Sequence, residues 1–220
     1  NSQINNYRDS LSIYFPGFGL DNNNFEFNAS YLANRFVTID IGNGKHFLGD
    51  GYQSLLLSDI ASPYPYFRIT TKFGPIRYYN LYTTFINPNM FNYERKKHAS
   101  IHYLNVSINE RIQIGLFESV VWLSKTKDHN TGYDLAYLNP IIFYRPVEFS
   151  QGSNKANVLM GLNFNFLFNY SSLYGQLVID DLNVSSIDNS DGFFQNKFGY
   201  QLGLKGQIHE LEYLIEYNQV

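Results

Sequence analysis

The sequence predicts an all-β protein, and more specifically an antiparallel transmembrane β-barrel of the outer-membrane type. First, apolar residues alternate with polar ones, as in NVLMGLNFNFLFN at residues 157–169, and such alternation is typical of a strand with two different faces. Second, several alternating segments reach about 11 to 15 residues, whereas globular strands cluster near 5 to 6 and membrane strands need about 9 to 11. Third, the polar side of these segments is made of Asn, Gln, Ser, Thr and Gly and is seldom charged in mid-strand, which suits a water-filled lumen.

The amino-acid composition narrows the classes of function that the protein can have. The chain has 220 residues, enough for one domain, and a formal net charge of -3, which provides no basic surface for nucleic acid. Charged residues make up 16% of the chain, below the roughly 25% usual in soluble domains. Aromatic residues make up 18%, and cysteine is absent, which excludes disulfides and thiolate chemistry. No segment has the roughly 18 apolar residues that a membrane-spanning helix needs.

The alternating segments follow one another along most of the chain. Up to about Asn24 the sequence is rich in Asn and broken by Pro and Gly, which indicates a strand end and a loop. Strands are then expected at residues 25–41, 66–73, 76–86, 98–108, 111–123, 157–169, 172–182, 194–208 and 211–217. Two-residue connections between alternating segments predict hairpins, so a meander of about eight to ten antiparallel strands is expected.

Two irregular segments interrupt this pattern, near residues 42–66 and 133–153. Both are rich in Gly or Pro and in bulky side chains, and Pro disrupts a strand ladder. We expect short helices or loops there that plug or cap the lumen of a wide barrel. Because an open sheet edge cannot be tolerated in lipid, residues 1–220 are expected to be a portion of a single larger barrel. The missing initiator Met and a C-terminus that stops within a strand pattern favour the same expectation.

A soluble β-sandwich or jelly roll is the alternative fold, because its strands also alternate. The long strands and the Tyr and Phe residues near strand ends, such as Tyr66, Phe194 and Tyr217, favour the membrane barrel, where aromatic residues gather at both interfaces.

The irregular segments also resemble a known family. The matching stretches are GNGKHFLGDGYQSLLLSD at 42–59, SPYPYFRITTKF at 62–73, IQIGLFESVVW at 112–122, YLNPIIFYRPVEFSQGS at 137–153, LYGQLVIDDL at 173–182 and NKFGYQLGLK at 196–205. In this order they resemble the Wzi capsule-assembly outer-membrane family, and most closely its RemB-like branch linked to gliding motility. The similarity covers most of the chain from about residue 25 onward.

The resemblance implies a large barrel in the bacterial outer membrane, without catalysis and without a cofactor. The implied role is to bind or organise surface polysaccharide, or to support cell-surface adhesion and gliding. Membrane lipid, lipopolysaccharide and surface polysaccharide are the expected partners, possible further partners being other outer-membrane or periplasmic proteins. A second hypothesis is a structural subunit of a larger outer-membrane secretion, motility or nutrient-uptake complex. A third, an outer-membrane enzyme, would need a His and a nucleophile or acid at one rim, which the sequence does not display.

Candidate ligand-binding residues lie in the two irregular segments. They are Asp50, Tyr52, Asn139, Tyr144, Arg145 and Glu148. In the functional interpretation Tyr stacks on a sugar while Asn, Arg and Glu bind hydroxyl groups. In the structural interpretation, which the usual pairing of buried charges favours, Arg145 and Glu148 form an ion pair that pins a cap to the wall.

No catalytic or metal site is predicted. His98 and His102 have the spacing of a helical metal pair, but on a strand they lie about 13 Å apart at about 3.4 Å per residue. Asp180 and Asp181 point to opposite faces of a strand, and Trp122 is interpreted as a membrane-interface anchor. The chain has no His-Glu-x-x-His motif, Gly-x-Ser-x-Gly elbow or complete Walker loop.

Overall fold

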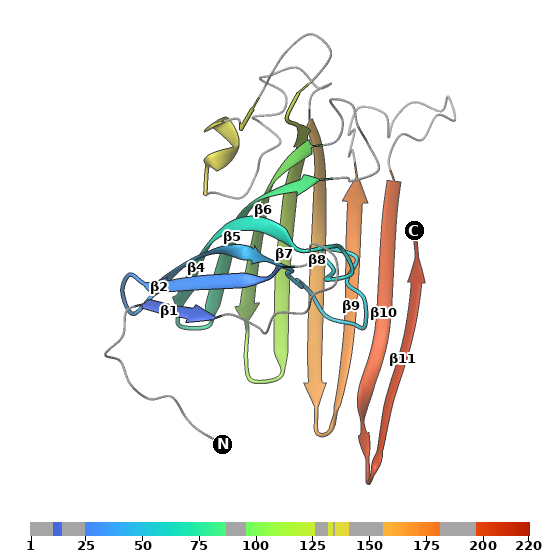
Figure 1. The fold of residues 1–220 in the computed structure, drawn as a ribbon. Coiled ribbons are helices and arrows are strands. Elements are labelled where there is room, and N and C mark those ends of the chain that lie inside the picture. The colour runs from blue at the N-terminus through green and yellow to red at the C-terminus, as the bar shows by residue number, and fades with distance from the viewer. Residues whose placement is uncertain are drawn as a thin grey trace, which may run out of the picture.

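A computed structural model describes the fold of residues 11–14, 25–86, 96–125, 132–133, 135–140, 156–180 and 197–220. These residues form one antiparallel sheet of eleven strands, which follow each other in chain order from β1 to β11 (Figure 1). The strands are β1 (Leu11–Tyr14), β2 (Phe27–Leu32), β3 (Val37–Gly44), β4 (Tyr64–Phe73), β5 (Ile76–Ile86), β6 (Lys96–Ser107), β7 (Ile112–Leu123), β8 (Ala156–Phe168), β9 (Ser171–Asp180), β10 (Lys197–Ile208) and β11 (Leu211–Gln219). A 3-10 helix, η2 (Leu135–Leu138), lies between β7 and β8 in the chain.

The predicted all-β antiparallel meander is confirmed, with eleven strands where about eight to ten were expected. The expected single strand at residues 25–41 is two strands, β2 and β3. The side chain of Asn34 accepts hydrogen bonds from the backbone N–H groups of Phe36 and Val37 at 2.8 and 3.0 Å, and this Asx-type turn reverses the chain. Asn34 stands among residues that continue the strand pattern, so periodicity alone misses the turn.

The two ends of the sheet differ in their connections. Short turns join strands at residues 33–36, 74–75, 108–111, 169–170 and 209–210, all at one end of the sheet (Figure 1). The segments that connect the strands at their other ends are longer in sequence. We call the end with the short turns the short-turn end. The described part of the second irregular region contains η2, and the first forms a loop at residues 45–63, which we call the inner loop. Among the described residues, no helix is long and apolar enough to cross a membrane.

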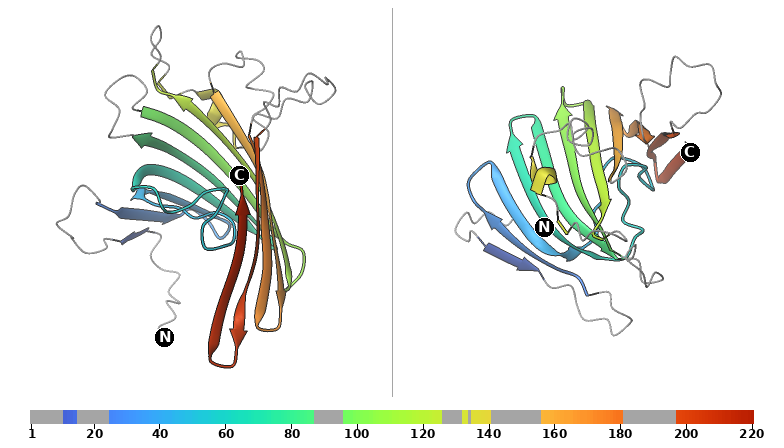
Figure 2. Two further views of the ribbon diagram at one scale, coloured as in Figure 1. Left: turned by 90° about the vertical axis from the view of Figure 1, so that its right-hand side faces the viewer. Right: turned by 90° about the horizontal axis from the view of Figure 1, so that it is seen from above.

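The two faces of the sheet carry different side chains. The sheet curves, and the inner loop lies within the curve (Figure 2). We call inner face the side that bears Asn163 and Gln176, which contact the inner loop, and outer face the side that bears Leu162 and Leu177. Because the strands pair without slipping from β4 to β11, each row of paired residues continues on one face.

The outer face of β8 to β11 is an exposed apolar surface, which we call the apolar band. Its exposed large side chains are Leu162, Phe164, Phe166, Phe168, Leu177, Phe198, Tyr200, Leu202, Ile208, Leu211, Ile215 and Tyr217. Within these four described strands no charged residue lies on the outer face, whereas Lys205 and Glu216 lie on the inner one. The distribution is the reverse of a soluble sheet, whose polar face meets water.

A buried cluster joins the inner loop to the inner face. Leu48 and Leu56 of the loop pack with Leu81, Ile101 and Phe117 of β5 to β7. Leu48 and Leu57 form an isolated bridge, with the Leu48 N–H donating to the Leu57 carbonyl at 3.0 Å. The loop therefore returns on itself and presents its apolar side chains to the inner face of the sheet.

Candidate functional site

The inner loop is held to the sheet by an aspartate that binds side chains from β8. The carboxylate of Asp50 accepts hydrogen bonds from the amide groups of Asn163 at 2.9 Å and Asn165 at 2.6 Å, and its backbone N–H donates to the Asn163 amide oxygen at 3.2 Å. Hydrogen bonds that involve an ionised group are about twice as strong as neutral ones. Asp50 thus ties the inner loop to the inner face of β8.

Glycines on both sides of Asp50 let the backbone of the inner loop approach the strands closely. Gly49 and Gly51 have φ angles of 103° and 110°, a region that residues with a side chain rarely adopt. A Cβ at Gly51 would also lie 2.7 Å from the carboxylate of Glu216 and 3.0 Å from the amide of Gln201. The Gly-Asp-Gly sequence was the available signal for this contact, because both glycines are needed for close approach to the strands.

Side chains from β9, β10 and β11 bind the loop backbone after Asp50. The Gln176 amide oxygen accepts from the Leu55 N–H at 2.7 Å, and the Gln201 amide donates to the Gln53 carbonyl at 2.7 Å. Glu216 accepts from the Tyr52 N–H at 2.9 Å and from the Tyr174 hydroxyl at 2.8 Å. These mid-strand polar residues lie on the inner face of the sheet, and the sequence did not predict their contacts with the loop.

A second polar cluster lies where β3 and β4 meet the start of the loop. The Arg68 guanidinium and the Asp40 carboxylate form a salt bridge of 3.0 Å. His46 is 7% exposed and lies between Tyr64 and Tyr66, with its Nδ1 atom 3.3 Å from the Tyr64 hydroxyl. Burial lowers the pKa of His46 from 6.5 to about 4, and the charge of Arg68 acts in the same direction while Asp40 opposes it. His46 is therefore neutral near pH 7.

The lowered pKa of His46 predicts that acid weakens the packing of the inner loop against the sheet. Because the folded pKa is below the unfolded value of 6.5, the neutral form contributes stability above that pH, and the contribution is lost as pH falls towards 4. We expect the midpoint of thermal unfolding to fall as the pH is lowered through this range. His46→Gln should reduce that fall, because glutamine does not titrate. The difference in pKa between the two states corresponds to at most about 3 kcal/mol of stability. Thermal unfolding of both proteins at several pH values measures it, and equal slopes would contradict this role of His46.

The described residues of the second irregular region lie on the outer face instead. The Tyr78 and Tyr82 hydroxyls donate to the carbonyls of Pro140 at 2.6 Å and Leu138 at 3.1 Å. The Tyr133 and Tyr137 rings pack against Trp122. Trp122 is thus buried in a contact with its own chain.

The predicted site residues are consequently distributed over both faces. Asp50 and Tyr52 lie in the inner loop, although the Tyr52 side chain is exposed and only its backbone is bound to Glu216. Asn139 lies in the segment on the outer face, so the structure does not bring it to Asp50. The other three predicted residues, Tyr144, Arg145 and Glu148, lie outside the described residues.

The histidine pair also lies on the outer face of β6. His98 is 2.8 Å from the Thr84 hydroxyl through its Nδ1 atom and packs against Trp122, and His102 pairs across the sheet with Asn80 and Glu118. In the described part of the chain, no three His, Cys, Asp or Glu side chains are grouped so that they could hold a metal ion. Asp180 ends β9, and Asp181 is outside the described residues.

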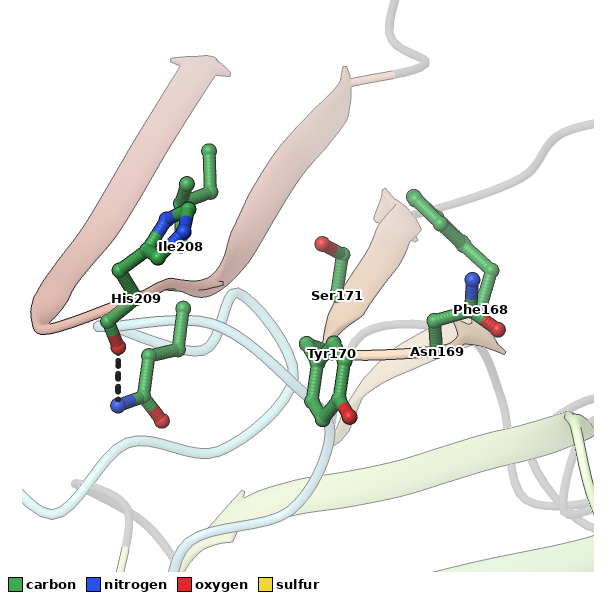
Figure 3. A pocket seen from close by; sticks show the side chains of 7 residues that line it. Phe168, Asn169, Tyr170, Ser171, Ile208 and His209 are labelled. Atoms are coloured by element: carbon green, nitrogen blue, oxygen red, sulfur yellow. Dashed lines mark hydrogen bonds between the residues drawn. The ribbon is translucent and has the colours of Figure 1, made fainter.

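A groove of about 610 Å³ separates the turns that follow β8 and β10 (Figure 3). Phe168, Tyr170 and Ile208 provide its apolar lining, and the Gln207 amide donates to the His209 carbonyl at 2.9 Å. The groove lies at the short-turn end and contains no carboxylate or permanent cation in its lining. It offers apolar contact, with the Ser171 hydroxyl and the His209 ring also in its lining.

The inner face thus combines amides, hydroxyls, tyrosines and a few paired charges around a seated loop, an arrangement suited to binding polar molecules. Comparisons of the chain with protein-family models, with curated proteins and with solved structures found no match.

Proposed function

We propose that this chain forms part of the wall of a bacterial outer-membrane β-barrel. The observation that carries the proposal is the apolar band on β8 to β11, which is exposed and free of charge while the opposite face is polar and binds a loop. Monomeric soluble proteins rarely expose continuous apolar patches of this kind, and lipid is a solvent that suits one.

The strand lengths support the same proposal. β8 has 13 residues and β10 has 12, which meets the roughly 9 to 11 that a tilted strand needs to cross a bilayer. The alternation of short turns and longer connections is also typical of outer-membrane barrels, whose short turns face the periplasm. By that rule the short-turn end is periplasmic, and exposed aromatic residues such as Tyr170 lie near an interface.

Closure of the barrel requires more than these strands. Among the described residues β1 and β11 each pair with one neighbour, so both carry unpaired backbone groups along one edge. Such edges cannot face lipid. We therefore propose that further strands, from this polypeptide or from another, complete the wall, with the inner loop as a plug in the lumen.

Within that barrel, we propose a non-enzymatic role in binding or organising surface polysaccharide, with a contribution to adhesion or gliding. The resemblance of the loop motifs to the Wzi family supports this role, as does the concentration of amides and tyrosines on the inner face, such as Asn163, Gln176 and Tyr174. The alternative, a structural subunit of a larger outer-membrane complex, is favoured by the two open edges of the sheet.

The test has two parts. We expect the full-length protein to fractionate with the outer membrane and to require detergent for extraction; a compact, detergent-free monomer in the aqueous fraction would contradict the barrel. We then expect the detergent-purified protein to bind surface polysaccharide on a glycan array. Stable recovery only with partner proteins, and no glycan binding, would favour the structural subunit.

A further inference from the structure

A small polar pocket lies on the inner face at the short-turn end, remote from the contacts of Asp50. Its volume is about 160 Å³, and it borders the Gly74-Pro75 turn between β4 and β5. The polar side chains that line it are Lys72, Arg77, Asn105, Ser107 and Gln113. The pocket is small against the 300 Å³ or more of a typical drug-sized site, so it suits one unit of a longer ligand.

The pocket contains two cations side by side. Lys72 on β4 is paired directly across the sheet with Arg77 on β5, and like charges in this position destabilise a sheet. Neither takes part in a salt bridge in the described part of the chain, where Arg68 and Asp40 form one. Arg77 donates to the Tyr79 hydroxyl at 3.4 Å, which leaves most of its five N–H donors for another group. An oxyanion between the two side chains would relieve the repulsion.

The neighbouring side chains offer acceptors as well as donors. Asn105 is paired across the sheet with Arg77, and its amide oxygen is buried with no hydrogen-bond partner among the described residues. Ser107 and Gln113 are paired beside it and add a hydroxyl and an amide. A bare anion would leave the Asn105 acceptor unsatisfied, whereas a sugar that carries both a carboxylate and hydroxyl groups would bind the cations and also donate to this oxygen.

We propose that this pocket binds the carboxylate-bearing sugar unit of an acidic polysaccharide. Arg77 and Lys72 hold the carboxylate, and Asn105 accepts a hydrogen bond from a hydroxyl of the same sugar. The assignment rests on the proposed polysaccharide role and gives that role a substrate class and a place on the wall.

Isothermal titration of the full-length protein in detergent tests this site, with trigalacturonate as the probe and its methyl ester as the uncharged match. We expect the acid to bind and the ester to bind at least about tenfold more weakly, with affinity falling as salt rises. Arg77→Gln and Lys72→Gln should each weaken binding of the acid about tenfold. Lys97→Gln is the control, because it removes the same charge from the inner face at the opposite end of the sheet.

The variant Asn105→Asp distinguishes loss of the binding site from loss of the folded structure. The new carboxylate would lie opposite Arg77 and occupy its charge, so we expect binding to be abolished while the thermal unfolding midpoint is kept or raised. Equal binding of acid and ester, an effect of Lys97→Gln as large as that of Arg77→Gln, or displacement by inorganic phosphate at equal concentration would overturn the sugar site. Membrane location and binding of neutral glycans would then still stand, so failure of this inference is distinct from failure of the proposed function.

Discussion

Replacing Leu162 by arginine is expected to destabilise the membrane-folded protein by about 2–4 kcal/mol, the range for a cation on the lipid face near the bilayer midplane. Leu162 lies on the outer face of β8 between Leu116 and Leu177, is 40% exposed, and belongs to the apolar band. In water the same substitution at a partly exposed leucine would change stability by about 0.5 kcal/mol or less. Denaturant unfolding in lipid vesicles, followed by the fluorescence of the single Trp, measures the difference.

Leu214→Arg is the matched control for that experiment. Leu214 is 47% exposed and lies on the inner face of β11, where it pairs with Lys205. The change is chemically identical, and we expect a loss of less than about 1 kcal/mol, because the new charge lies on the inner face and only its pairing with Lys205 opposes it. Equal effects of the two substitutions would show that the outer face does not meet hydrocarbon.

Replacing Asp50 by alanine is expected to release the inner loop, at a loss of about 2–4 kcal/mol of local stability. The substitution removes two charge-assisted hydrogen bonds, and it leaves the amides of Asn163 and Asn165 buried without this acceptor. Each buried donor left unsatisfied costs about 1–3 kcal/mol. Hydrogen exchange over residues 48–57 should become markedly faster, since the Tyr52 and Leu55 N–H groups donate to Glu216 and Gln176 of the sheet only while the loop is held against it.

Asp59→Ala provides the control within the same loop. Asp59 is exposed, and its side chain makes no hydrogen bond or ion pair among the described residues. We expect its removal to leave exchange over residues 48–57 unchanged. If Asp50→Ala also leaves hydrogen exchange over these residues unchanged, the loop is held by its apolar contacts and Asp50 is not its anchor.

Periodicity predicted most of the sheet, because alternation is a local property of the chain. The segment at 157–169 illustrates this: β8 spans Ala156–Phe168, and its alternate apolar residues all lie on the outer face. The turn at Asn34 was missed because two hydrogen bonds to one side chain, not a change in hydrophobic pattern, reverse the chain after β2.

The contacts of the inner loop could not be predicted in the same way. Asp50 binds Asn163 and Gln176, which lie 113 and 126 residues further along the chain. No local pattern specifies such partners, although Gly49-Asp50-Gly51 marks a backbone that must approach another surface closely. For the same reason the sequence placed Asn139 near the lumen, whereas it lies in a segment that binds Tyr78 and Tyr82 on the outer face.

The solvent that each face meets can be measured directly, because the chain has no cysteine and single-cysteine variants carry one label each. A fluorophore at Leu202→Cys on the outer face of β10 and one at Leu214→Cys on the inner face of β11 are compared in reconstituted full-length protein. We predict that bromines on lipid acyl chains quench the label at position 202 and not the one at 214, and that aqueous iodide does the opposite. Quenching of the label at 202 by iodide but not by brominated lipid would contradict a membrane-facing apolar band.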